Sequence, residues 1–141
     1  MGIMKRVVCF AFVLLILTVA SPASSGDKIK LKMKGPRTVF MKPAGMYRHS
    51  PVSVRVSAQL EGTFEDPEEY YCLEQEWEWG DETESFREPD CDPWEEGAEV
   101  GRNFSASHTF RYPGTYIIHL RLQRSGDTII MGKHSVRIRG Q

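Results

Sequence analysis

Strict alternation of hydrophobic and polar residues recurs along most of the chain, and this pattern predicts β-strands. In the first alternating stretch, residues 28–34, Ile29, Leu31 and Met33 form one face and lysines form the other. Lysine at every outer position is typical of an exposed edge strand, because the charge discourages pairing with another chain. Residues 38–41 predict a short strand between turns at 35–36 and 43–45.

Longer alternating stretches predict the main strands. Their expected inner faces carry Val52, Val54, Val56, Ala58 and Leu60, then Leu73, Trp77 and Trp79, then Tyr116, Ile118, Leu120 and Leu122. Gln75 interrupts the second of these faces, which favours a bulge or a later start of that strand. Residues 128–139 predict the last strand, with Val136 and Ile138 facing inward.

Together these patterns predict an all-β fold with minimal helix. About seven short strands separated by Gly, Pro and acidic segments, with no 3.6-residue apolar period, are typical of two antiparallel sheets packed face to face. The 141 residues fit one such domain, and no repeat of fixed period divides them.

The N-terminus predicts a secretory signal peptide. Lys5 and Arg6 precede an uncharged apolar run over residues 7–20, and small residues follow at 21–25. Cleavage after Ala23 and cleavage after Ser25 both meet the requirement for small residues. The run is shorter than the roughly 20 residues that span a bilayer, and no second run follows. The mature chain is therefore expected to have no membrane span and to be secreted or periplasmic.

These observations divide the chain into three parts. Residues 1–25 are assigned to a signal helix, residues 26–49 to an N-terminal strand extension and linker, and residues 50–141 to the β-sandwich domain.

Two stretches of the sandwich resemble the signatures of polycystic kidney disease (PKD) domains. The sequence WEWGDE, from Trp77 to Glu82, resembles the WDFGDG signature of that family, with Glu82 in place of its second glycine. The sequence HTFRYPGTYIIHLRL, from His108 to Leu122, resembles the second signature, H-x-Y, then P-G-x-Y, then alternating apolar residues. The resemblance covers residues 50–139 and implies an immunoglobulin-like, PKD-type sandwich that works as a non-catalytic module of secreted proteins.

The roles that the resemblance implies for the signature residues are structural. Trp77 and Trp79 are expected to fill the space between the sheets, and His108 and Phe110 to pack there. Gly80 and Asp81 are expected to turn the chain out of the tryptophan strand. Pro113 and Gly114 turn the chain into the strand of Tyr116, which stands where such sandwiches keep a tyrosine hydrogen-bonded to backbone.

Cys72 and Cys91 are the two cysteines that remain once the signal peptide is removed. An even pair in an exported chain favours a disulfide, and two free thiols are the alternative.

Acidic residues are concentrated in the middle of the chain. Residues 61–96 contain 16 acidic residues and one base, Arg87, whereas the chain without residues 1–25 holds 16 basic and 19 acidic residues, a net charge of −3. A net negative chain is a poor partner for nucleic acid.

Three interpretations of the acidic segment stay open. It could supply the oxygen ligands that Ca²⁺ needs, it could be a docking surface for a basic partner with aromatic anchors, or it could be a solvated loop. The candidate calcium ligands are Asp81, Glu82, Glu84, Asp90 and Asp92, and the candidate binding residues are Tyr70, Trp94, Glu95 and Glu96.

Nothing in the sequence indicates catalysis or a cofactor other than calcium. The four histidines have no metal-ligand spacing, and there is no nucleophile elbow, phosphate loop or dinucleotide fingerprint. The expected function is non-catalytic binding of protein or polysaccharide outside the cytoplasm. The alternative is a structural subunit of a surface or secreted assembly.

Overall fold

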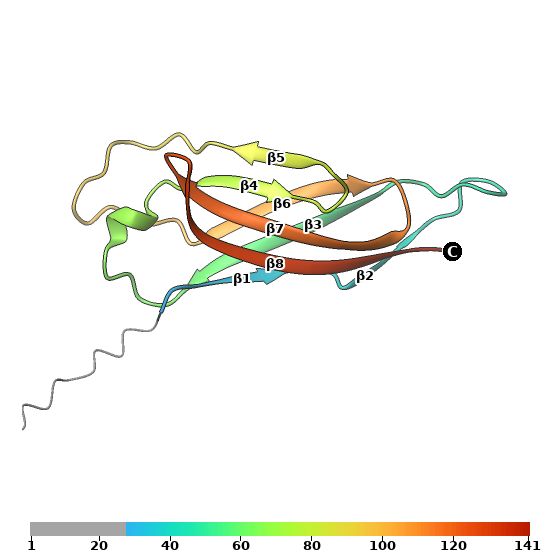
Figure 1. The fold of residues 1–141 in the computed structure, drawn as a ribbon, viewed down its shortest axis with the longest axis horizontal. Coiled ribbons are helices and arrows are strands. Elements are labelled where there is room, and N and C mark those ends of the chain that lie inside the picture. The colour runs from blue at the N-terminus through green and yellow to red at the C-terminus, as the bar shows by residue number, and fades with distance from the viewer. Residues whose placement is uncertain (1–27) are drawn as a thin grey trace, which may run out of the picture.

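The computed structural model describes residues 28–141, which form a two-layer β-sandwich (Figure 1). One sheet has the strand order β1-β3-β6, and the other has the order β2-β8-β7-β4-β5. The first sheet comprises β1 (Lys30–Lys34), β3 (Val52–Glu61) and β6 (Asn103–Phe110). The second comprises β2 (Thr38–Met41), β4 (Glu74–Glu78), β5 (Glu84–Arg87), β7 (Gly114–Arg124) and β8 (Asp127–Gly140). A single turn of 3₁₀ helix, η1 (Pro67–Tyr70), follows β3.

The order of the strands is that of an immunoglobulin-like sandwich, whose strands A, B and E form one sheet and G, F and C the other. The prediction of an all-β, two-sheet fold is confirmed, but the prediction that both sheets are antiparallel is wrong. Strand β2 pairs with β8 in parallel, with Val39 opposite Ile138. The reason is that the short connection after β1 carries the chain across to the second sheet without reversing its direction.

Residues 26–49, expected to form an extension and linker, contribute β1 to one sheet and β2 to the other. Strand β1 lies at the edge of its sheet and pairs only with β3, as its lysines predict. The signal helix assigned to residues 1–25 lies outside the described residues. Between residues 28 and 141, no helix is long and apolar enough to cross a membrane.

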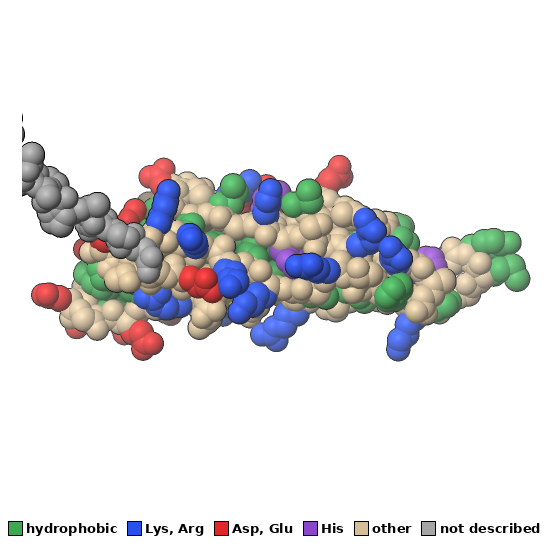
Figure 2. Space-filling view, turned by 90° about the horizontal axis from the view of Figure 1, so that it is seen from below, with side chains coloured by type: hydrophobic (Ala, Val, Ile, Leu, Met, Phe, Trp, Pro, Cys, Tyr) green, Lys and Arg blue, Asp and Glu red, His purple; other side chains and the backbone are tan. Residues whose placement is uncertain are grey.

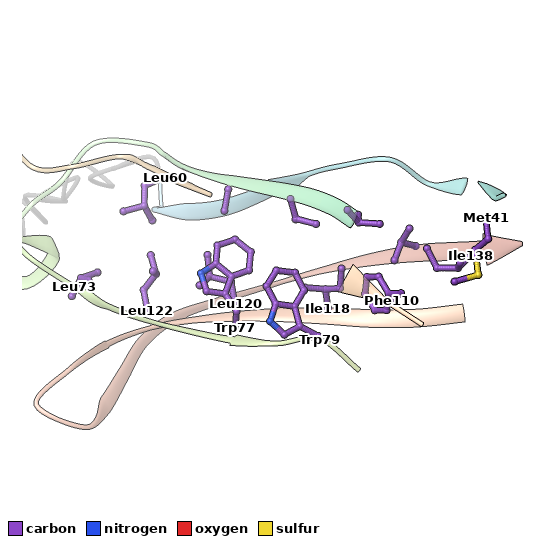
Figure 3. Close-up of a cluster of buried hydrophobic side chains, with 14 residues drawn as sticks. Met41, Leu60, Leu73, Trp77, Trp79, Phe110, Ile118, Leu120, Leu122 and Ile138 are labelled. Carbon is purple, nitrogen blue, oxygen red and sulfur yellow. The ribbon is translucent and has the colours of Figure 1, made fainter. Parts of the chain in front are cut away.

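The inner faces of the sheets form the core that the alternation predicts (Figure 3). Fully buried residues include Val56 and Leu60 of β3, Leu120 and Leu122 of β7, and Ile138 of β8. Apolar side chains from both layers interdigitate here, and burying each large one stabilises the fold by about 1.5–3 kcal/mol.

Gln75 is a polar residue on the otherwise apolar inner face of β4, and a hydrogen bond accommodates it there. Strand β4 begins at Glu74 rather than at residue 71, so the later start is confirmed, and β4 pairs with β7 without a register shift. Gln75 remains on the inner face because its Oε1 accepts a hydrogen bond from Nε1 of Trp77 at 3.3 Å. Each buried polar group thus satisfies the other.

Two neighbouring residues of β7 allow a matched test of the core. Ile118 is fully buried, whereas the side chain of Ile117 is 51% exposed on the opposite face. We expect Ile118→Ala to lower the free energy of unfolding by about 3 kcal/mol, because it leaves a cavity. Ile117→Ala should lower it by less than about 1 kcal/mol. Urea denaturation measures both values, and equal losses would contradict the assigned faces.

Candidate functional site

The two signature stretches meet as a column of rings between the sheets, which we call the ring column. Trp77 stacks on Trp79 with ring centroids 5.6 Å apart, and Trp79 stacks on His108 at 4.8 Å. His108 meets Phe110 edge-on at 4.8 Å, and Phe110 lies 4.4 Å from Tyr116. The tryptophans come from β4 and the residue after it, whereas His108 and Phe110 come from β6. The column therefore joins the two layers.

Asp81 holds the exposed side of this column. Its Oδ2 lies 2.7 Å from Nε2 of His108, and its Oδ1 accepts hydrogen bonds from the backbone N–H of Thr83, at 3.2 Å, and from the Thr83 hydroxyl. Burial alone would raise the pKa of Asp81, but the hydrogen bonds from Thr83 and His108 and the charge of His108 together lower it. The carboxylate thus fixes both the turn and the imidazole.

The turn that carries Asp81 depends on two residues with positive φ. Gly80 has φ 79°, and a Cβ at this position would lie 2.7 Å from the carbonyl oxygen of Ile117, so only glycine fits. Glu82 has φ 67°, a left-handed conformation that glycine adopts more easily. Glu82 therefore keeps a glycine-like backbone where the PKD signature has glycine.

Tyr116 makes the backbone hydrogen bond that its position implies. Its hydroxyl donates to the carbonyl oxygen of Tyr112 at 2.8 Å, across the turn that contains Pro113 and Gly114. Burial and, secondarily, the charge of Asp81 raise the pKa of Tyr116, so the hydroxyl keeps the proton that it donates. This bond fixes the β6–β7 turn against the ring column.

Asp81 and His108 have the composition of an acid–base dyad, but their surroundings favour a packing role. The imidazole lies between Trp79 and Phe110, and its Nε2 already faces Asp81 and the Thr83 hydroxyl, 3.3 Å away. The ring is thus held by aromatic contacts with Trp79 and Phe110 and by Asp81, which accounts for its conformation as that of a packing residue.

The lowered pKa of Asp81 leads to a pH-dependent prediction. An ionised group whose pKa is lower in the folded than in the unfolded state stabilises above the ordinary carboxyl pKa of about 4, and this contribution is lost as the pH falls through the lowered value. We expect Asp81→Asn to reduce the free energy of unfolding by about 1–2 kcal/mol at pH 7. The difference from wild type should shrink below about pH 4.

Chemical denaturation across this pH range measures the effect. The neighbouring variant Glu82→Gln is the control, since its side chain is exposed and makes none of these contacts. A loss in Asp81→Asn that stays constant with pH would exclude the ionised carboxylate as its cause.

The acidic loops gather at the end of the sandwich where β3 and β5 finish and β4 and β6 begin (Figure 1). We call residues 61–73 and 88–101 the acidic end. They contain Glu61, Glu65, Asp66, Glu68, Glu69, Glu88, Asp90, Asp92, Glu95, Glu96 and Glu99.

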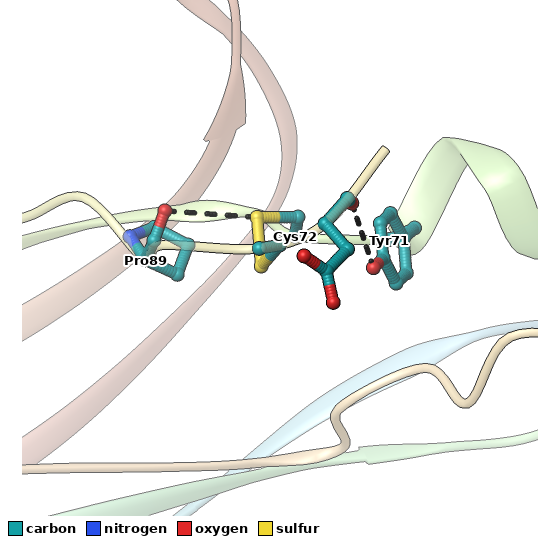
Figure 4. The surroundings of a disulfide bond; sticks show 5 residues. Tyr71, Cys72 and Pro89 are labelled. Atoms are coloured by element: carbon teal, nitrogen blue, oxygen red, sulfur yellow. Dashed lines mark hydrogen bonds between the residues drawn. A yellow bond between two sulfur atoms is a disulfide. The ribbon is translucent and has the colours of Figure 1, made fainter. Parts of the chain in front are cut away.

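A disulfide between Cys72 and Cys91 ties these two loops together, as predicted (Figure 4). Next to it, the Tyr71 hydroxyl donates to the carbonyl oxygen of Asp92 at 3.0 Å, and the Tyr71 ring packs edge-on against Trp94 at 5.0 Å. The covalent bond and these contacts oppose the mutual repulsion of the carboxylates.

The aromatic residues expected as binding anchors pack within the molecule. Tyr70 is half-buried and stacks on Phe64, with ring centroids 4.9 Å apart, and Trp94 is half-buried against Tyr71. Glu95 and Glu96 are exposed. What the acidic end offers to a partner is therefore mainly charge.

The candidate calcium ligands are not brought together. Asp81 is engaged with His108, and within residues 28–141 no group of three or more His, Cys, Asp or Glu side chains is placed to hold a metal ion. The geometry therefore gives no support to the calcium hypothesis.

The disulfide can be tested by removing both sulfurs. Cys72→Ser with Cys91→Ser should lower the free energy of unfolding by about 3 kcal/mol, because the bond closes a loop with a sequence separation of 19 residues. Salt should restore part of this loss by screening the carboxylates. Urea denaturation at low and high salt measures both effects. Thiol titration of unfolded, unreduced wild type should find no free thiol in the mature chain.

The opposite end of the sandwich carries a feature that the sequence did not single out. Residues 42–50 form a hairpin between β2 and β3, closed by a bridge between Pro43 and His49 and by a hydrogen bond from Ala44 N–H to the Arg48 carbonyl oxygen at 2.8 Å. At its tip, Met46 and Tyr47 are 87% and 91% exposed. These two adjacent side chains form an exposed apolar surface between Lys42 and Arg48, and apolar surface rimmed by polar residues is typical of interaction sites.

Further aromatic and basic residues share this end with the hairpin. Here β2, β6 and β8 finish and β3 and β7 begin, which brings Phe40 and Tyr112, both largely exposed, to the same end. We call the hairpin and these neighbours the hairpin end. Its exposed members are Phe40, Lys42, Met46, Tyr47, Arg48, Arg111, Tyr112 and Arg139.

Acidic and basic residues are therefore distributed unevenly between the two ends of the molecule. No Asp or Glu occurs in residues 40–51, 110–116 or 138–141, which build the hairpin end, although Asp81 of the β4–β5 turn lies beside Arg111 and Tyr112. On the face seen in Figure 2, acidic side chains gather mainly at one end and hydrophobic ones at the tip of the other, with Lys and Arg over the middle and toward the tip. The sequence signal for this end was the acid-free stretch around the apolar pair 46–47.

Comparison with known proteins adds little to this description. No family model matches the chain, and no curated protein matches it. Two structures of a CARDB domain from Pyrococcus furiosus are similar to it. A solution NMR structure has a TM-score of 0.41 and 11% identity, covering 78% of this chain and 93% of that one. A crystal structure in complex with di-metal ions has a TM-score of 0.40 and 8% identity, covering 79% and 92%. Likeness at this level supports no argument about ligand or function.

Proposed function

We propose that this chain is a secreted, non-catalytic recognition module of PKD type that binds a negatively charged macromolecule, an anionic polysaccharide or an acidic protein, through its hairpin end. The observation that carries the proposal is the nearly complete exposure of Met46 and Tyr47 on a hydrogen-bonded hairpin. A hairpin backbone that is already ordered loses little conformational entropy when its side chains bind a partner, which suits a contact surface.

The charge of the hairpin end indicates the class of partner. Lys42, Arg48, Arg111 and Arg139 are exposed there, and no acidic residue lies in residues 40–51, 110–116 or 138–141. Aromatic rings interspersed with basic side chains favour a partner that carries both negative charge and apolar surface.

The proposal also holds that the chain is exported and that it is not an enzyme. The disulfide suits an oxidising compartment, in agreement with the expected signal peptide. The polar residues of the signature stretches are engaged in holding the fold, as the PKD resemblance implies.

Binding to an immobilised polyanion tests the proposal. We expect the mature chain to be retained on heparin, and Tyr47→Ala with Arg48→Ala to weaken this binding at least about tenfold, since an apolar anchor and a charge are both lost. Phe86→Ala is the control, because Phe86 is a comparably exposed aromatic residue on β5, outside the hairpin end. Equal retention of all three proteins would contradict the proposed surface.

A further inference from the structure

We propose that the hairpin end of one copy docks on the acidic end of a second copy, so that the module associates head to tail. This inference rests on the proposed function, because it names the partner of the same hairpin end. Head-to-tail association would also explain how the chain could act as a structural subunit of an assembly, the alternative function that the sequence left open.

The first argument is the complementary charge of the two ends. Every acidic residue of the described chain except Asp127 lies within residues 61–99, whereas the charged residues of the hairpin itself, Lys42 and Arg48, are cations. The acid beside Arg111 and Tyr112, Asp81, is engaged with His108 and Thr83. In the middle of the sandwich, Glu76 and Glu78 of β4 are paired with Arg121 at 3.4 and 3.0 Å. These two carboxylates of the middle are therefore compensated, and the uncompensated carboxylates lie mainly at the acidic end.

Two cations at the acidic end, Arg102 and Arg124, are engaged within it, whereas Lys28 and Arg87 are exposed. Arg102 donates to the carbonyl oxygens of Leu60 and Gly62, at 3.3 and 3.0 Å, and its guanidinium lies 4.1 Å from the centroid of Phe64. Arg124 contacts Glu68 through both the backbone carbonyl and the carboxylate. Most of the eleven carboxylates of this end are left to face outward.

The second argument is the shape and chemistry of the receiving surface. An open hollow of ≈ 320 Å³ lies at the acidic end, with Ile29 and Tyr70 as its apolar lining and Glu65, Asp66 and Glu69 as its acidic lining, beside Lys28. Apolar surface next to carboxylates complements the hairpin, whose apolar tip lies between Lys42 and Arg48. Met46 and Tyr47 would fill the hollow while the two cations face the carboxylates.

The third argument concerns symmetry. The two surfaces differ and lie at opposite ends of an elongated molecule (Figure 2), so a contact between them is heterologous and leaves one end of each kind free. Such a contact propagates as an open chain instead of closing into a two-fold dimer.

Two variants, each blocked at one end, test this arrangement by sedimentation velocity of the mature chain. The hairpin variant carries Met46→Ser and Tyr47→Ser, and the acidic-end variant carries Glu65→Lys and Glu69→Lys. Wild type should associate progressively with concentration, and at least tenfold more weakly in 1 M than in 0.1 M salt, since the Debye length falls from about 10 to about 3 Å. Each variant alone should be monomeric. A mixture of the two should form a 1:1 dimer and nothing larger, because it offers one intact contact.

Matched controls separate the contact from general effects. Phe86→Ser with Met131→Ser removes exposed apolar side chains elsewhere, and Glu82→Lys with Glu84→Lys makes the same change in net charge outside both ends. Both controls should associate like wild type. Circular dichroism and thermal unfolding confirm that each variant is folded.

Other outcomes overturn the inference in distinguishable ways. Self-association of the acidic-end variant alone would indicate a contact between two hairpins, and a monomeric mixture would exclude docking between copies. Binding of that variant to vesicles of phosphatidylglycerol, with a monomeric mixture, would assign the hairpin to a lipid surface. Heparin retention that persists in the absence of self-association would leave the proposed function standing, whereas loss of both would remove it.

Discussion

The contact on which the rest of the structure depends is the stacking of His108 on Trp79 across the two sheets, fixed by Asp81. Two sheets with apolar inner faces can slide over one another, because hydrophobic burial has no direction. A ring column with defined stacking and a carboxylate at 2.7 Å from the imidazole has direction, and it selects one arrangement of the layers. The β4–β5 turn and the Tyr116 corner are then positioned relative to the same column.

Because apolar packing and a few hydrogen-bonded polar groups stabilise the core, the charged side chains are not needed to hold the fold. Among residues 28–141 no charged side chain is buried in the core, and Arg121 compensates Glu76 and Glu78 on the outer face of β4 and β7. Carboxylates can therefore accumulate in the loops at one end without disturbing the sheets. The disulfide of Cys72 and Cys91 limits how far those loops can be driven apart by repulsion.

The sequence predicted the features that depend on local pattern. Alternation placed the inner residues of β3, β7 and β8, and the lysines placed β1 at an edge, because one-sided burial imposes a period of two. The parallel pairing of β2, the Gln75–Trp77 hydrogen bond and the inward packing of Tyr70 and Trp94 escaped prediction. The pairing of β2 and the packing of the two rings depend on contacts between segments, and the Gln75–Trp77 bond depends on the side-chain rotamers of one strand; the alternation pattern encodes neither. The hairpin end escaped for the same reason, since Phe40, Met46 and Tyr112 come together only in the folded chain.

The polarity of the molecule follows from the topology as much as from the composition. All acidic residues except Asp27 and Asp127 lie within residues 61–99, a contiguous segment, but its strands β4 and β5 run along the length of the sandwich. The separation arises because Arg121 compensates the carboxylates of β4, while the two flanking loops return to the same end. The hairpin between β2 and β3 and the turn between β6 and β7, both free of acids, lie at the other end. The β4–β5 turn on that side does carry Asp81 and Glu82, but Asp81 is engaged with His108 and Thr83. The loops of the two ends therefore differ in charge, which suits the head-to-tail contact that we propose.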